Sequence, residues 1–148
     1  MRVEQAFTVA RPPEVVFDYL TDPATLADWQ TSKTSVTPLT EGPPRLGTRV
    51  RERTKPPGGR EFEQVVELTE FDRPRRVHVH IVDGPQPIDG TWSFAPDGRG
   101  GTRVHFVGEG PLRGPARLLG PLVQRLVARQ FAGCHDRLRR NVEALRAS

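Results

Sequence analysis

The segment GTWSFAPDGRGGTRVHFVGE, residues 90–109, decides the fold together with the apolar stripe that follows it. Trp92 and Phe94 alternate with polar residues, a turn-rich APDGRGG comes next, and then Val104 and Phe106 alternate again. Period-two alternation around a Gly, Pro and Asp cluster is typical of a β-hairpin. The period then changes to three or four residues, which predicts one face of a long helix. That face carries Leu119, Val123, Val127, Phe131, Cys134, Leu138, Val142 and Leu145.

Composition limits the class of protein. The chain has 148 residues and a formal net charge of +4, and its length predicts one domain, 1–148. Nearly all its cations are arginines, a bias more typical of a GC-rich genome than of a nucleic-acid site, so no nucleic-acid partner is expected. Cys134 is the only cysteine, which excludes an internal disulfide. No apolar leader or long apolar run is present, so we expect a soluble, cytoplasmic protein.

The order of elements predicts an α+β domain with an antiparallel sheet. Alternation near the start predicts a first strand, Pro12 and Pro13 suit a helix entry, and Asp22 caps a second short helix that ends at Trp29. Regular turns, such as PPGG, then separate the strand-like segments and favour a meander. The strand-like segments are 34–39, 48–54, 61–71 and 76–82, before the hairpin and a closing helix over about 115–147.

Four stretches resemble a known superfamily. They are FTVARPPEVVFDYLTDPATLADWQ, LGTRV, the GTWSF-PDG-GTRV-F hairpin, and LLGPLVQRLVARQF in the closing helix. The chain resembles the SRPBCC, or START-like, superfamily, with the polyketide cyclase/dehydrase and lipid-transport group as the nearest branch. The resemblance implies a helix-grip fold, in which a curved antiparallel sheet of about seven strands, two short helices and a long C-terminal helix enclose a cavity. Members bind lipids, polyketides, hormones or quinones, and some catalyse reactions.

Hairpin geometry predicts which side chains face the cavity. If Trp92 pairs near Val104 and Phe94 near Thr102, then Trp92 points inward together with Phe106. By the same alternation around PPGG, one face carries Val50, Glu52, Phe62 and Gln64.

Glu52 is therefore a carboxyl group on an otherwise apolar face. A buried carboxylate must be paired, protonated or hydrogen-bonded. Arg51 and Arg53 point the other way, so desolvation is expected to raise the pKa of Glu52. Two interpretations stay open, an anchor or general base inside the cavity and a wetted residue at its mouth.

The histidines do not predict a metal site. His78 and His80 lie two apart on one strand, but the valines between them form the better inward set and turn both outward. In a meander, His105 lies two strands away. His135 follows Cys134 on the helix, where adjacent residues point in different directions, so a Cys/His catalytic pair is not expected. We expect no metal and no cofactor.

Aromatic residues around a cavity suit a planar or polycyclic ligand, although each could equally be core packing. Glu52 is the one candidate for a catalytic role. The candidate ligand-binding residues are Phe17, Trp29, Glu52, Phe62, Gln64, Trp92, Phe106, Val127, Phe131 and Cys134.

The closing helix has two further features. Gly120-Pro121 predicts a kink or restart, which would be either a hinge over the cavity mouth or a rigid bend. Arginines give its exterior a positive charge, which either faces solvent or contacts anionic lipid.

Three functional classes are consistent with the sequence. The first, which we favour, is a binder or carrier of a small hydrophobic molecule. The second is a polyketide cyclase or dehydratase that uses an acid/base residue in the cavity, and the third is a protein-interaction module. A large empty cavity would favour the first two, and a filled core with an exposed apolar patch would favour the third. The sequence does not determine the oligomeric state.

Overall fold

The computed structural model describes residues 1–56, 58–85, 87–112 and 114–145. Its seven strands are β1 (Arg2–Val9), β2 (Lys33–Pro38), β3 (Arg49–Thr54), β4 (Phe62–Asp72), β5 (Arg76–Asp83), β6 (Asp89–Pro96) and β7 (Thr102–Glu109). The helices are α1 (Pro13–Thr21), α2 (Leu26–Trp29) and α3 (Gly120–Glu143), and the short 3-10 helices η1 (Pro23–Thr25) and η2 (Gly114–Leu119) precede α2 and α3.

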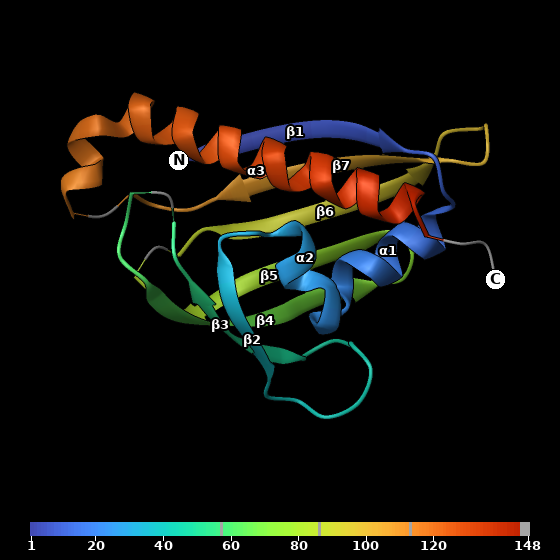
Figure 1. Cartoon of the computed structure of the whole chain (residues 1–148), viewed down its shortest axis with the longest axis horizontal. Helices are drawn as coiled ribbons and strands as arrows, with labels where there is room; N and C mark the ends of the chain where they lie inside the picture. Colours follow the sequence, from blue (N-terminus) through green and yellow to red (C-terminus); the bar gives the residue numbers. More distant parts are fainter. Residues whose placement is uncertain (57, 86, 113, 146–148) are drawn as a thin grey trace.

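The strands form one antiparallel sheet in the order β1-β7-β6-β5-β4-β3-β2. Strands β2 to β7 are a meander, and β1 pairs with β7. The connection through α1 and α2 therefore crosses from one edge of the sheet to the other. Figure 1 shows α3 lying across one face of the sheet, with α1 and α2 on the same side. The predicted α+β helix-grip architecture is confirmed.

The hairpin differs from the expected pairing by two residues. Trp92 pairs with Phe106 and Phe94 with Val104, instead of with Val104 and Thr102. Because the side-chain period of a strand is two, an even shift keeps the same side chains on the same face. All four of these apolar residues are at most 5% exposed, so the inward face was predicted correctly.

The helices α1 and α2 place Trp29 in the core. Helix α1 begins at Pro13, where the missing N–H costs no helical hydrogen bond. The carboxylate of Asp22 then accepts a hydrogen bond from the backbone N–H of Ala24 at 2.9 Å, which caps the next turn as predicted. The short α2 ends at Trp29, whose side chain is fully buried.

Helix α3 confirms the predicted restart but begins later than expected. It starts at Gly120, and the turn before it is the 3-10 helix η2, because Pro121 fits only the first turn of an α-helix. Val127 and Phe131 pack against the core, and Cys134 and Leu138 are buried in it, as predicted. The helix ends at Glu143, and the expected end at residue 147 lies outside the described residues.

The two ends of the apolar face predicted for this helix are not covered by the rest of the protein. Leu119 and Leu145, which were expected on the buried face, are 55% and 39% exposed. At the η2 end the helical segment extends beyond the sheet, as Figure 1 shows, and Leu145 lies after the last residue of α3. Among the described residues, no helix is both long and apolar enough to cross a membrane.

Candidate functional site

A cavity of about 310 Å³ lies between the inner face of the sheet, the α2–β2 segment and α3. This volume is at the lower end of the range typical of small-molecule sites. Val77, Val79 and Ile81 line it, so His78 and His80 point to the outer face, as expected. Most of the remaining wall is apolar and comes from Leu20, Leu26, Val50, Val66, Leu68, Ile88, Val127 and Phe131.

All the candidate ligand-binding residues except Phe17 and Phe106 line the cavity. Those on the wall are Trp29, Glu52, Phe62, Gln64, Trp92, Val127, Phe131 and Cys134. Phe17 packs edge-on against Phe71 and Phe94, with ring centroids 5.1 and 5.3 Å away. Phe106 is covered by Trp92 and Phe131, at 4.8 and 4.6 Å. Both are therefore core residues behind the wall.

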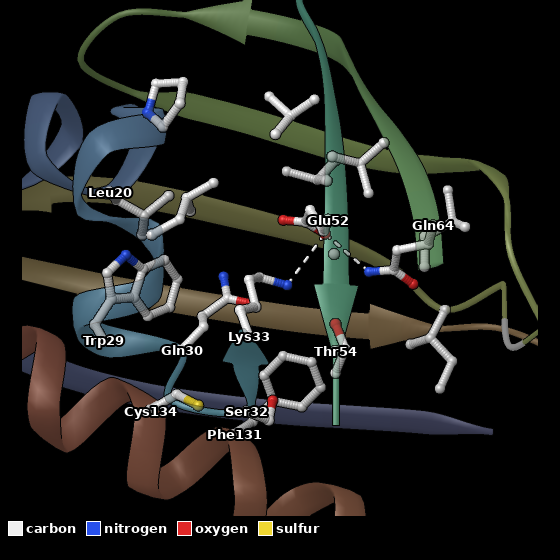
Figure 2. Close-up of a pocket in the computed structure, with 18 of the residues that line it drawn as sticks. Leu20, Trp29, Gln30, Ser32, Lys33, Glu52, Thr54, Gln64, Phe131 and Cys134 are labelled. Carbon is white, nitrogen blue, oxygen red and sulfur yellow. Dashed lines mark hydrogen bonds and ion pairs between the residues drawn. The ribbon is translucent and has the colours of Figure 1, made fainter. Parts of the chain in front are cut away.

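Glu52 lies in a buried polar cluster on the sheet wall. The Gln64 amide donates a hydrogen bond to Oε1 of Glu52 at 2.9 Å, and the Lys33 ammonium is 3.1 Å from the same oxygen. The side chains of Lys33 and Glu52 are only 7% and 4% exposed. Figure 2 shows Glu52 between these two partners, above Phe131 and Cys134 of α3. Glu52 is thus paired and hydrogen-bonded, and its counter-ion is Lys33, which the sequence analysis did not name.

A β-bulge places Lys33 in the cavity. Val36 pairs with Glu52 and shares its face, so strict alternation would bring Thr34 inward and turn Lys33 outward. The register shifts between Lys33 and Ser35, and Lys33 instead pairs with Thr54 on the inner face. A bulge of this kind re-aims a side chain. Sequence reasoning missed Lys33, although it is one of only two lysines in an arginine-rich chain.

Another buried polar residue, His135, lies behind the cavity wall and forms a hydrogen bond with Trp92. The indole N–H of Trp92 donates to Nε2 of His135 at 3.1 Å, and Nδ1 lies 2.8 Å from the Gln5 amide oxygen. Since an indole N–H can only donate, Nε2 accepts and Nδ1 carries the proton that it donates to Gln5. The Gln5 amide in turn donates to the Ala128 carbonyl at 2.7 Å. The chain of bonds ties β1, β6 and α3 together.

Burial lowers the pKa of His135 to about 4, from an ordinary value of 6.5. The imidazole stacks on the Phe7 ring at 4.7 Å and meets the Phe106 ring edge-on at 4.9 Å. These apolar rings keep water away from the imidazole, which disfavours its charged form. His135 is therefore neutral at neutral pH. Cys134 and His135 point in different directions, as predicted, because only Cys134 lines the cavity.

Two buried polar atoms on the cavity wall have no hydrogen-bond partner among the described residues. They are Nε1 of Trp29 and Oγ1 of Thr54. A buried polar group without a partner costs about 1–3 kcal/mol, so such groups are rare in native proteins. Both side chains line the cavity, but the two atoms themselves are buried, so a bound molecule would have to shift the indole or the hydroxyl to become their partner.

Gly90 completes the floor of the cavity. A Cβ at this position would meet the six-membered ring of Trp92 at 2.9 Å and the ring of Phe106 at 3.2 Å. Real Cβ atoms essentially never come within 3.0 Å of another heavy atom, so the absent side chain is what allows the indole to lie flat over the strand.

The cavity wall has neither a reactive thiol nor a metal site among the described residues. Burial raises the pKa of the Cys134 thiol, so the unreactive, protonated form dominates at neutral pH. Within the described ranges, no three His, Cys, Asp or Glu side chains come together as a metal site.

Solved structures of other proteins share this fold. TTHA0849 from Thermus thermophilus is similar with a TM-score of 0.83 and 26% identity over 97% of this chain and 98% of that one. A START superfamily protein from Mycobacterium smegmatis has a TM-score of 0.80 at 18% identity, covering 98% and 99% of the two chains. The Zhui aromatase/cyclase from a Streptomyces species has a TM-score of 0.76 at 18% identity, covering 97% and 93%.

No curated protein sequence matches the chain at a significant level. The family profile described as polyketide cyclase/dehydrase and lipid transport matches residues 1–143. The match spans the whole sheet and all of α3. The chain therefore belongs to the polyketide cyclase/dehydrase and lipid transport family.

Proposed function

We propose that the protein binds and carries a small, mostly apolar molecule in the cavity between the sheet, α2 and α3. The observation that carries the proposal is the pairing of an apolar wall with two unpartnered polar atoms, Trp29 Nε1 and Thr54 Oγ1. A ligand oxygen that accepts from the indole N–H would relieve one of these costs. The expected ligand is therefore a hydrocarbon framework with at least one carbonyl or hydroxyl oxygen.

The flat side chains favour a planar framework. Trp29 and Trp92 meet edge to face at a centroid distance of 6.1 Å, and both line the cavity. Their rigid rings offer a large apolar contact area at little cost in side-chain entropy. A planar or polycyclic ligand would use both walls at once.

A pair of variants on β4 tests binding itself. Val66 lines the cavity and Val65 does not. Val66→Phe should fill the cavity and weaken binding of the neutral fluorescent probe phenylnaphthylamine by roughly tenfold or more. Val65→Phe adds the same volume on the other face and should leave the affinity unchanged. Equal affinity in both variants, with an intact circular dichroism spectrum, would overturn the proposal.

Mass spectrometry of the freshly purified protein is the direct search for the natural ligand. Native spectra should show a mass excess that disappears on denaturation, and extraction with organic solvent should release a molecule of that mass. The same preparation of Val66→Phe should lack the excess.

One observation favours an enzyme as the second candidate. Lys33 and Glu52 form a buried acid/base pair on the cavity wall, close enough together to move a proton on a bound carbonyl compound. Turnover of a linear poly-β-ketone into a cyclic product would support this function. The activity should vanish in the neutral pair Lys33→Met with Glu52→Gln, while phenylnaphthylamine still binds.

A further inference from the structure

A second hollow, of about 500 Å³, opens between α3, the Thr31–Ser32 turn and the end of β3. We call it the cationic groove, because its charged side chains are Lys55, Arg129, Arg137 and Arg140. No carboxylate from the described part of the chain lines it. It differs sharply from the apolar cavity beside it.

The two hollows adjoin each other. Ser32, Pro56, Gln130 and Cys134 line both of them, so the groove begins where the cavity ends. The Gln130 amide donates to the Ser32 hydroxyl at 3.1 Å, which bridges α3 and the start of β2 at this boundary. A molecule that extends out of the cavity on this side would enter the groove.

The groove has an excess of positive charge. Arg140 pairs with the Asp136 carboxylate at 3.1 Å, and Arg137 donates to the Asp28 carbonyl at 2.8 Å. Within the described residues, Lys55 and Arg129 have no carboxylate within 4.0 Å. The sequence also contains no Asp or Glu from Gly110 to His135, so nothing on this part of the helix offsets the charge.

Gly133 keeps the groove open. It lies in the middle of α3 and lines the groove, and a Cβ there would meet nothing within 4 Å. A glycine inside a helix lowers stability by about 1 kcal/mol relative to alanine. At position 133 no neighbouring group would clash with a side chain, so packing does not explain the glycine. The open space is therefore available to a ligand.

The cavity itself gives an anion no comparable attraction. Lys33 is its cation, and Glu52 neutralises that charge at 3.1 Å. Charge thus increases from the inside of the cavity to the outside, in the same direction as the polarity of an amphiphile whose apolar end enters first.

From this arrangement we infer that the natural ligand is an anionic amphiphile. Its apolar part occupies the cavity, and its carboxylate or phosphate group lies in the cationic groove beside Lys55 and Arg129. The inference rests on the proposed function, since it requires that the cavity bind an apolar molecule. It assigns the groove a part in selecting the ligand and orients the ligand in the site.

Decanoate and 1-decanol test the inference, because they share an apolar chain and differ in charge. Affinities are measured by displacement of phenylnaphthylamine below the micelle-forming concentration. Decanoate should bind the native protein roughly tenfold more tightly than decanol, and high salt should reduce the difference. Lys55→Gln with Arg129→Gln should abolish the difference and leave decanol binding unchanged.

The matched control is Arg53→Gln with Arg125→Gln, which removes the same charge from exposed positions outside the groove. It should keep the preference for decanoate. Equal binding of decanoate and decanol to the native protein would overturn the inference. So would a preference that survives loss of Lys55 and Arg129 but disappears in Lys33→Met with Glu52→Gln, because the anion would then lie inside.

Two outcomes separate the inference from the proposed function. Equal affinities of decanoate and decanol for the native protein, with phenylnaphthylamine still bound, would overturn the inference alone and leave the proposed function standing. Failure of phenylnaphthylamine, decanol and decanoate alike to bind would overturn both proposals.

Discussion

The two tryptophans meet edge to face on the cavity wall but differ in how their indole N–H groups are satisfied. Trp92 donates to His135, which is itself bonded to Gln5. Trp29 is equally buried, and its N–H has no partner among the described residues. We call the side with Trp92, His135 and Gln5 the closed wall.

The side with Trp29, Lys33, Glu52 and Thr54 is the open wall. Complete hydrogen bonding fixes a side chain for structural reasons, whereas unpaired buried atoms lower stability and are expected where a ligand completes them. We propose that the closed wall positions the cavity and that the open wall contacts the ligand. Three experiments test this division and a fourth tests the neighbouring groove, from the largest expected effect to the smallest.

Glu52→Gln should destabilise the protein by about 3–5 kcal/mol, because it leaves the Lys33 ammonium buried without a counter-ion. Adding Lys33→Met to the same chain should recover most of the loss, since the buried charge is then gone. Urea unfolding of the native protein, both single variants and the double variant measures the coupling. Additive losses would show that the ion pair does not hold the open wall together.

Acid should weaken the closed wall through His135. Its pKa is about 4 when folded and 6.5 ordinarily, so between these values the unfolded chain binds a proton that the folded chain does not. Stability should therefore fall as the pH drops from about 6.5 to about 4, by roughly 3 kcal/mol from this group. Urea unfolding across this range should show a smaller fall in His135→Gln. Equal slopes for His135→Gln and the native protein would contradict the prediction.

Replacing each tryptophan by phenylalanine compares the walls directly. Trp92→Phe leaves Nε2 of His135 without its donor and should cost about 2 kcal/mol more than Trp29→Phe, which removes an unpaired N–H. Thermal and urea unfolding give the two values. In binding, only Trp29→Phe should reduce the preference for fluorenone over fluorene, which differ by one carbonyl oxygen. The reverse ranking would exchange the roles of the walls.

The smallest effect is expected at Gly133, which is exposed on α3 and lines the cationic groove. Gly133→Ala should raise stability by up to about 1 kcal/mol, because alanine favours the helix and its methyl group meets nothing. Gly101→Ala is the contrasting substitution, since its Cβ would come within 2.8 Å of the Val9 carbonyl oxygen, and it should destabilise. Thermal unfolding compares the two, and a destabilised Gly133→Ala would show that the groove is already filled.

The sequence predicted which side chains of a strand face inward better than it predicted the polar contacts among them. Strict alternation places Trp92 and Phe106 on the inner face even though their pairing was displaced by two residues. The position of Lys33 depends on one extra residue in β2. A bulge is defined by how two strands pair, so the alternation within one strand does not predict it.

The same limit applies to depth in the core. Phe17 and Phe131 have the same side chain and both were expected at the site, but only Phe131 lines the cavity. Which aromatic ring lies behind another is a property of tertiary packing, and periodicity along one chain does not contain it. Likewise, the hydrogen bond from Trp92 to His135 joins residues 43 positions apart, and no local pattern predicts it.

Gly90 makes this a site whose size could be engineered by one methyl group. An added Cβ would press on the rings of Trp92 and Phe106, and the indole would have to tilt away from the strand. Its tilt would move a cavity wall and strain the bond to His135 together. A Gly90→Ala variant could therefore be paired with a synthetic ligand that is smaller where the indole moves inward. Such a ligand would fit the variant, while the native protein would keep its own ligand.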